Sequence, residues 1–113
     1  MDNVKDDQYY VAKILDDLKA VILYTKGRTK AEFETDEVLI DAIMFRIIQI
    51  AENSTRLSET FKAVHNKVPW KAIRGMRNII VHDYGEMDLT IVYDTVIHGI
   101  PDMYDLFMGI AHE

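Results

Sequence analysis

The chain has 113 residues, the size of one ordinary domain, and its 49% hydrophobic and 28% charged residues are typical of a globular protein. Charges interrupt every apolar run before membrane-spanning length, so we expect no membrane partner, and the lack of cysteine excludes disulfides and thiolate metal sites. Residues 1–7 lack the pattern of a secretory signal, which predicts a cytoplasmic location, and the net charge of -6 argues against a broad nucleic-acid-binding surface.

The first half of the sequence predicts two long helices joined by a short one. Apolar residues three and four positions apart predict an amphipathic helix over residues 7–24, which Gly27 is expected to end. Thr29 followed by Glu32 is the sequence of a capping box and predicts a short helical turn. The next helix is predicted over residues 37–57. Its apolar residues cover more than one stripe, so we expect it to be the central helix.

The next segment predicts a brief helix followed by a longer one. Ser58 and the apolar residues Phe61 and Val64 indicate a brief helical extension. Val-Pro-Trp at residues 68–70 is expected to open a further helix, with Pro69 near its first turn. Gly85 is expected to end that helix by adopting a left-handed conformation.

The last part of the chain predicts two more helical segments. Asp88 is placed to cap a segment over residues 89–98, and Pro101 is expected to interrupt it and to start a last short helix. Residues 89–96 are rich in β-branched side chains, but no alternating strand pattern is present. The sequence therefore predicts a single all-α domain over residues 1–113, a bundle of about five helices.

Residues 77–84, Arg-Asn-Ile-Ile-Val-His-Asp-Tyr, place several chemically active groups at the end of one predicted helix. Arg77 supplies a fixed cation that can hold a phosphate through two donors. His82 supplies the type of side chain whose unperturbed pKa lies nearest neutrality. Charge stabilisation and proton transfer could both come from this helix without a metal, which is sufficient chemistry to cleave RNA. The other histidines, His65, His98 and His112, have no metal-ligand spacing.

The helical repeat predicts how these groups are distributed around the helix. At about 100° per residue, one face is polar and contains Val81 within it. Its polar members are Lys71, Arg74, Arg77, Asn78 and His82. The opposite arc, expected in the core, contains Ile73, Met76, Ile79 and Ile80. Asn78 and His82 lie one turn apart, whereas Arg77 points well away from His82. A second copy related by a twofold axis would bring Arg77 of one chain toward His82 of the other, so the spacing suggests a homodimeric site.

Basic residues concentrate around the predicted site. Residues 56–77 contain six basic residues against the single acid Glu59, a local charge of +5, and the rest of the chain carries -11. This distribution suits local capture of RNA phosphates, for which Lys71 and Arg74 are the candidate contacts. The alternative is a solvated charged surface with no ligand.

The chain resembles the HEPN superfamily, and most closely its HepT-like branch of small helical toxins. The branch's signature is an Arg, a polar residue, a His four to six positions after the Arg, and a Tyr two beyond. The matching residues are Arg77, Asn78, His82 and Tyr84. Residues 45–52 are also similar to a family helix that ends in Ile-Gly-Glu-Ala, and residues 68–70 match its usual lead-in. Ala51 stands where Gly is usual and Asn53 where Ala is usual, which alters the expected packing but not the catalytic set.

The resemblance implies a metal-independent endoribonuclease without a cofactor, built as a homodimer with the site between protomers. It also implies a partner, a minimal nucleotidyltransferase that acts as antitoxin by attaching AMP to Tyr84. Arg77 and His82 would be catalytic, with Asn78 orienting His82 or the phosphate. Glu52 and Asp83 are supporting residues, Glu52 as a candidate partner of Arg77.

Structural roles remain open for each of these residues. His82 could interact only with the end of its helix, Arg77 could pair with Glu52 or Asp83, and Tyr84 could be a half-buried aromatic residue with a solvated hydroxyl. A non-catalytic helical adaptor for a separate nucleotidyltransferase, or a plain oligomerisation bundle, is the alternative function.

Overall fold

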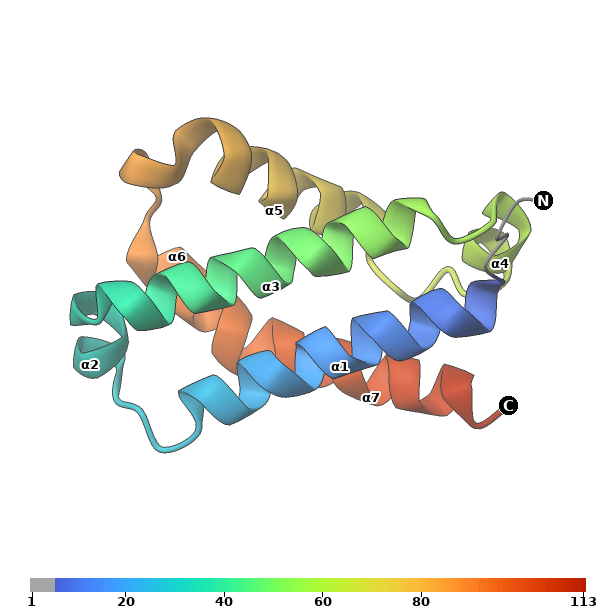
Figure 1. Ribbon diagram of the computed structural model, residues 1–113, viewed down its shortest axis with the longest axis horizontal. Coiled ribbons are helices and arrows are strands. Elements are labelled where there is room, and N and C mark those ends of the chain that lie inside the picture. The colour runs from blue at the N-terminus through green and yellow to red at the C-terminus, as the bar shows by residue number, and fades with distance from the viewer. Residues whose placement is uncertain (1–5) are drawn as a thin grey trace.

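The computed structural model describes residues 6–113, which form helices and connecting turns without a strand. The prediction that the chain begins without a secretory signal concerned residues 1–7, most of which lie outside the described residues. Four helices of 12 or more residues are joined by shorter helical elements (Figure 1). In chain order the elements are α1 (Asp7–Thr25), α2 (Lys30–Thr35), α3 (Glu37–Thr55), α4 (Glu59–Val64), α5 (Trp70–Asp83), the 3₁₀ turn η1 (Tyr84–Glu86), α6 (Leu89–Asp94), the π-helical turn η2 (Thr95–Gly99) and α7 (Ile100–Ala111). The predicted all-α class is confirmed.

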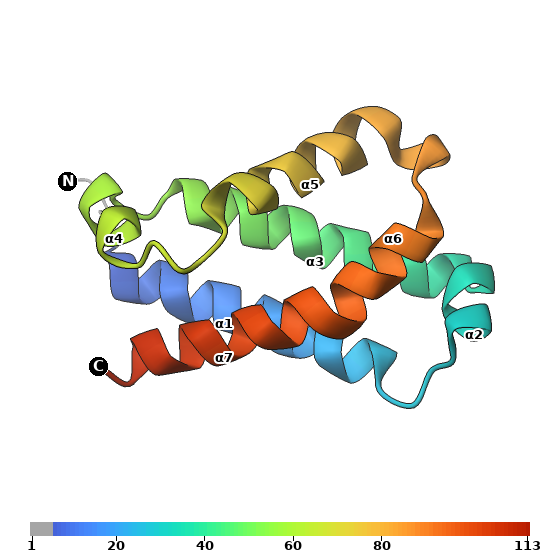
Figure 2. The ribbon, with the colours of Figure 1, turned by 180° about the vertical axis from the view of Figure 1, so that it is seen from behind.

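The long helices follow one another around the bundle. α3 packs on α1 on one side and on α5 on the other, and α1 also packs on α7 (Figures 1 and 2). α4 lies at the end of the molecule where α1 begins and α7 ends, and α2 lies at the opposite end (Figure 2). α5 makes most of its contacts with α3. The helix that carries the sequence motif is therefore attached mainly through one neighbour.

The core is formed chiefly by α1 and α3, with further buried side chains from the other elements. Its fully buried large side chains are Phe33, Phe107, Ile14, Leu18, Ile43, Met44, Val21 and Val96. α3 buries residues on several sides, as expected for the central helix. α5 buries only Ile73 and Ile80. The prediction that Ile79 lies in the core is wrong, because this residue is 48% exposed. The reason is that α5 faces a single helix, so only a narrow stripe of its surface is covered.

Most predicted helix ends are present. Gly27 has φ of 76°, the left-handed conformation that ends a helix, and Thr29 and Glu32 form both hydrogen bonds of a capping box. The side chain of Ser58 accepts a hydrogen bond from the backbone N–H of Phe61 at the start of α4. Asp88 caps α6 in the same way. The local signals for these boundaries are therefore confirmed.

Two predicted interruptions are wrong. Gly85 does not adopt a left-handed conformation, since Gly27 alone among the described glycines has positive φ. α5 instead ends at Asp83 and is followed by the 3₁₀ turn η1, after which the backbone of Met87 is extended. Pro101 does begin the last helix, since it lies in the first turn of α7, but the chain is not interrupted there, because the backbone of Gly99 and Ile100 is helical. The preceding π-helical turn η2 provides the wider spacing that keeps α6 and α7 continuous.

Candidate active site

The predicted site lies along the groove between α3 and α5, which run antiparallel. Two contacts between the helices define their register. Arg77 on α5 contacts Glu52 near the end of α3, and Tyr84 after α5 contacts Asp41 near the beginning of α3. We use the word groove for the line of contact between α3 and α5, with Arg77 near its middle and Tyr84 at the end where α3 begins.

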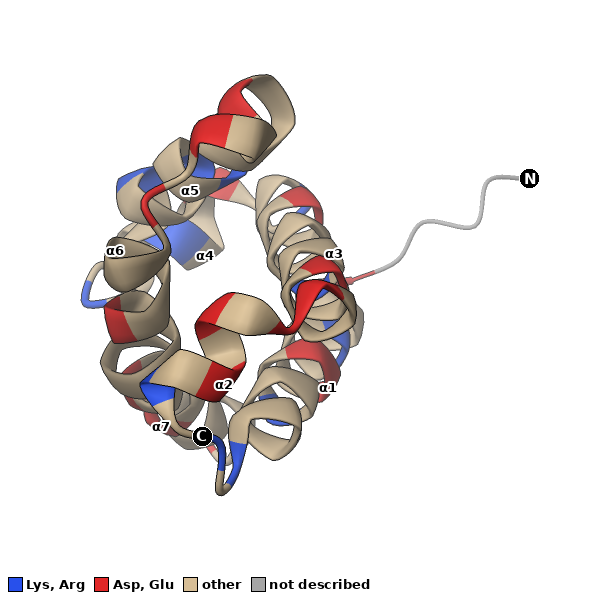
Figure 3. Cartoon of the chain, turned by 90° about the vertical axis from the view of Figure 1, so that its left-hand side faces the viewer, with Lys and Arg blue, Asp and Glu red and all other residues tan. Residues whose placement is uncertain are grey.

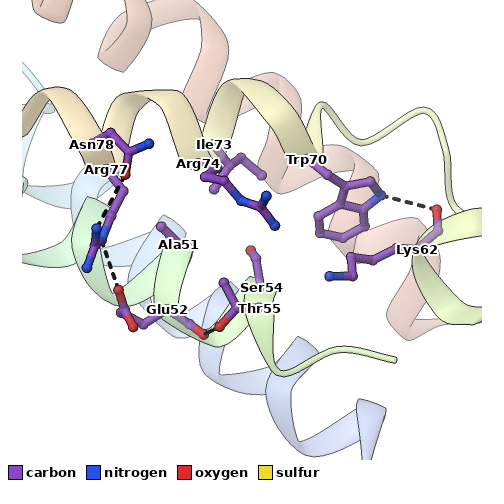
Figure 4. A pocket seen from close by; sticks show the side chains of 10 residues that line it. All are labelled: Ala51, Glu52, Ser54, Thr55, Lys62, Trp70, Ile73, Arg74, Arg77 and Asn78. Carbon is purple, nitrogen blue, oxygen red and sulfur yellow. Dashed lines mark hydrogen bonds and ion pairs between the residues drawn. The ribbon is translucent and has the colours of Figure 1, made fainter. Parts of the chain in front are cut away.

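Arg77 is held by two side-chain contacts. Its Nε donates a hydrogen bond to Oε1 of Glu52 at 3.0 Å, and its Nη1 donates to Oδ1 of Asn78 at 3.3 Å (Figure 4). The side chains of Arg77 and Glu52 are 36% and 43% exposed, so this ion pair contributes little to stability. It does fix the plane of the guanidinium. Nη2 has no protein partner among the described residues and remains able to bind an anion.

A cavity of about 270 Å³ opens beside Arg77. It is lined by Ala51, Glu52, Ser54, Thr55, Lys62, Trp70, Ile73, Arg74, Arg77 and Asn78 (Figure 4). Of the two predicted phosphate contacts, Arg74 lines this cavity and Lys71 does not. Lys71 lies exposed on the same helix. The structure thus brings Arg74, Arg77, Asn78 and Glu52 to one site.

His82 is not part of this cluster within a single chain. It lies exposed in the last turn of α5, and within residues 6–113 neither Asn78 nor Arg77 forms a hydrogen bond with it. Asp83 is also exposed, and the guanidinium of Arg77 contacts Glu52 rather than Asp83. The imidazole is therefore available to a ligand or to another chain.

Tyr84 lies at the end of the groove where α3 begins, in acidic surroundings. Its hydroxyl donates a hydrogen bond to Oδ1 of Asp41, and the residue is 41% exposed. Partial burial raises the pKa of Tyr84 to about 12, with the hydrogen bond and negative charge of Asp41 and the charge of Glu37 acting in the same direction. The phenol is therefore protonated at neutral pH, and it is accessible from solvent.

Charge is unevenly distributed along the groove. Figure 3 shows acidic segments on α2, on the near end of α3 and in the turn after α5, and basic segments on α5 and α4. The half that contains Lys62, Arg74 and Arg77 therefore attracts phosphate, and the half around Asp41 and Tyr84 repels it. An anionic strand is expected to bind at the basic half.

Exposed apolar side chains lie between these two halves. Phe45 on α3 is 57% exposed and Val81 on α5 is 46% exposed. In the antiparallel register set by the two cross-helix contacts, Phe45 and Val81 are opposite each other. Two exposed apolar side chains therefore lie beside the polar site.

Sequence reasoning missed three residues of the groove. Asp41, Lys62 and Trp70 were not proposed as site residues, yet Asp41 binds Tyr84 and the other two line the cavity. Asp41 precedes Glu52 by eleven positions, about three helical turns, so both lie on one face of α3. That spacing was the available signal for Asp41. Lys62 belongs to the basic segment over residues 56–77, which was a partial signal for it, but only tertiary packing brings it beside Trp70 in the cavity.

Within residues 6–113 no three His, Asp or Glu side chains are arranged to hold a metal ion. No helix in the same part of the chain has the length and apolar character needed to cross a bilayer.

Comparison with known proteins identifies the family. The family model described as Ribonuclease HepT-like matches residues 14–110. The chain is 32% identical over 109 residues to "Gamma-glutamylcyclotransferase and putative RNase" of Methanocaldococcus jannaschii, covering 96% of this chain but 49% of that protein. It is 32% identical over 100 residues to a "Putative RNase" of Caldanaerobacter subterraneus subsp. tengcongensis, covering 88% of this chain and 89% of the relative.

A third relative has the family's own name. The chain is 24% identical over 98 residues to "Probable ribonuclease HepT" of Thermococcus cleftensis, covering 87% of this chain and 89% of that protein. None of the solved structures matches the chain. The resemblance seen in residues 77–84 agrees with the family match, which spans most of the helical bundle. The chain belongs to the family of HepT-like ribonucleases.

Proposed function

We propose that the protein is a metal-independent endoribonuclease of the toxin type, acting on RNA in the cytoplasm. The observation that carries this proposal is the guanidinium of Arg77, held in place by Glu52 and Asn78 at the basic half of the groove. Membership in a ribonuclease family supports the reaction class. The groove supplies cations for a phosphate and an exposed imidazole nearby on the same helix.

In the proposed reaction the RNA 2′-hydroxyl attacks the adjacent phosphorus. A bond forms between the 2′-oxygen and phosphorus, the bond from phosphorus to the 5′-oxygen breaks, and the products are a 2′,3′-cyclic phosphate and a 5′-hydroxyl. His82 moves a proton in this step, and Arg77 stabilises the charge that builds on the phosphoryl oxygens. DNA has no 2′-hydroxyl and is therefore not cleaved.

We propose that the complete site requires two copies of the chain. Within one chain Arg77 is engaged with α3, and no hydrogen bond joins it to His82 in the described residues. The exposed Phe45 and Val81 lie between Arg77 and Tyr84 along the groove and would be buried by a second copy. A twofold axis through this surface would bring the Arg77 of one protomer toward the His82 of its partner.

We also propose that a minimal nucleotidyltransferase silences the enzyme by attaching AMP to Tyr84. The phenol is partly exposed, so an enzyme can reach it. Modification removes the proton that the hydroxyl donates to Asp41, and it places a phosphate against the carboxylates of Asp41 and Glu37. Repulsion would turn the modified side chain away from α3 and across the groove, where its bulk and charge would oppose RNA binding.

The direct test is cleavage of labelled single-stranded RNA by purified protein in the presence of a chelator. We expect the wild-type protein to cleave and both His82→Ala and Arg77→Ala to be slower by a factor of about 10² to 10⁴. Lys67→Ala, which removes an exposed cation outside the cavity, is the control and should cleave normally.

Equal cleavage by all the variants would attribute the activity to a contaminant. The non-catalytic adaptor for a nucleotidyltransferase would then be the better explanation. The modification is tested by mass spectrometry of protein produced together with a minimal nucleotidyltransferase, where we expect one added AMP on Tyr84 and none on Tyr84→Phe. AMP on a different tyrosine would refute the assignment.

A further inference from the structure

The cavity beside Arg77 extends away from His82, toward the beginning of α5. Its apolar lining includes Ala51 and Ile73, both buried, and the indole of Trp70 lines the part farthest from His82 (Figure 4). A concave site with an apolar lining and a few polar groups is the usual form of a small-ligand site, and 270 Å³ is slightly below the usual range of about 300–1,000 Å³. The cavity therefore suits a single small unit rather than a folded ligand.

Trp70 is fixed in position before any ligand arrives. Its Nε1 donates hydrogen bonds to the backbone carbonyls of Lys62 and His65, each at 3.2 Å. Its ring packs edge-on against Phe107, with the ring centroids 5.9 Å apart. An aromatic surface held in this way loses little side-chain entropy when a planar group packs on it.

Two cations extend into the same cavity. Arg74 forms no hydrogen bond or ion pair with any residue in the described part of the chain, and Figure 4 shows its guanidinium pointing into the space near Trp70. The side chain of Lys62 is only 14% exposed, and its ammonium lies 3.6 Å from the carboxylate of Glu59, which is 92% exposed. A carboxylate so open to solvent screens the ammonium weakly, so both cations remain available to an anion.

A planar aromatic surface, the unpaired Arg74 and the partly buried Lys62 together match the chemistry of a nucleotide. Nucleobases stack on aromatic side chains largely irrespective of their identity, and phosphates bind Arg and Lys. Arg74 precedes Arg77 by three residues and His82 by eight, which is about 4.5 Å and 12 Å along the helix axis. A ligand at Arg74 is therefore next to the reaction centre and not on it.

We propose that this cavity is the subsite for one nucleotide of the RNA strand, adjoining the nucleotide whose phosphate Arg77 holds. The base packs against Trp70, and the phosphate binds Arg74 and Lys62. This inference rests on the proposed ribonuclease function, because it assigns the strand's neighbouring unit to a place in the groove. It also gives Trp70 and Lys62 roles in binding the substrate.

The inference is tested by tryptophan fluorescence, because Trp70 is the single tryptophan of the chain. The two probes are AMP and a short single-stranded DNA oligomer, which has no 2′-hydroxyl and is not cleaved. We expect both to change the fluorescence in a saturable manner, with the oligomer binding more tightly. Arg74→Glu should weaken the binding of both probes at least about tenfold, and Lys67→Glu, the same charge change outside the cavity, by much less.

The other outcomes separate the subsite from the catalytic proposal. Absence of a saturable signal, or equal weakening by Arg74→Glu and Lys67→Glu, would overturn the subsite even if RNA cleavage depends on His82. AMP binding as tightly as the oligomer would overturn the assignment to an RNA strand and indicate a free nucleotide. The expected binding without RNA cleavage by the wild-type protein would support the subsite and count against the nuclease.

Discussion

Replacing Glu52 tests whether this carboxylate orients Arg77 or merely neutralises it. The Nε to Oε1 distance is 3.0 Å, for which Coulomb's law in water gives about 1.4 kcal/mol. Both side chains are more than a third exposed, and ordering them offsets most of that energy, which leaves roughly 0.2–1 kcal/mol. Glu52→Ala should therefore lower the melting temperature by no more than about 4–8 °C.

The effect on catalysis should be much larger than the effect on stability. Without its Nε partner the guanidinium can rotate, and a misplacement of about 1 Å can reduce a rate about 100-fold. We expect Glu52→Ala to reduce kcat for RNA cleavage by about 10- to 100-fold. Glu52→Gln retains an acceptor oxygen for Nε, so its kcat should remain within about threefold of the wild-type value.

The assay is steady-state cleavage of a labelled RNA, with thermal unfolding measured on the same preparations. Asp105→Ala is the control, because it removes one negative charge from α7, outside the groove. A Glu52→Ala protein that cleaves as fast as the wild type, or faster, would refute the orienting role. Glu52 would then be a partner that Arg77 must leave before it binds phosphate.

Three further predictions follow from burial, charge and the register of the groove. Asp41→Ala should lower the pKa of Tyr84 from about 12 toward 10, measured by ultraviolet difference titration against Tyr84→Phe, and an unchanged titration would contradict the Asp41 contact. Because the pKa of Tyr84 is higher in the folded protein than in the unfolded chain, the stability that Tyr84 contributes is present below about pH 10 and is lost as the pH rises toward 12. Ile80→Ala should lower the free energy of unfolding, measured in urea, by about 2–5 kcal/mol and Ile79→Ala by less than about 1 kcal/mol, because Ile80 is buried and Ile79 is half exposed. Equal losses of unfolding free energy in the two variants would show that the packing of α5 is misassigned. Phe45→Asp should convert the proposed dimer to monomer in sedimentation measurements, whereas Leu23→Asp, at an equally exposed position on α1, should not. A dimer that tolerates Phe45→Asp would place the interface elsewhere.

Local sequence signals determined the secondary structure and the family. Helix caps act over three or four residues, so Thr29, Ser58 and Asp88 could be assigned without any tertiary information. Residues 77–84 carry enough of a recognisable pattern to indicate the HepT-like branch, which the family match confirms. The same local reasoning failed at Pro101, where a π-helical turn adjusts the backbone in a way that no residue type specifies.

Tertiary packing decided which side chains meet in the groove. The sequence placed Arg77 and Tyr84 on one helix, but the antiparallel register of α5 on α3 brings Glu52 to the first and Asp41 to the second. The packing of the helices also leaves Ile79 exposed, because α3 is the only large element that covers α5 in the described part of the chain. Helical periodicity defines the direction of each side chain on its own helix, and only the packing of helices defines what lies opposite it.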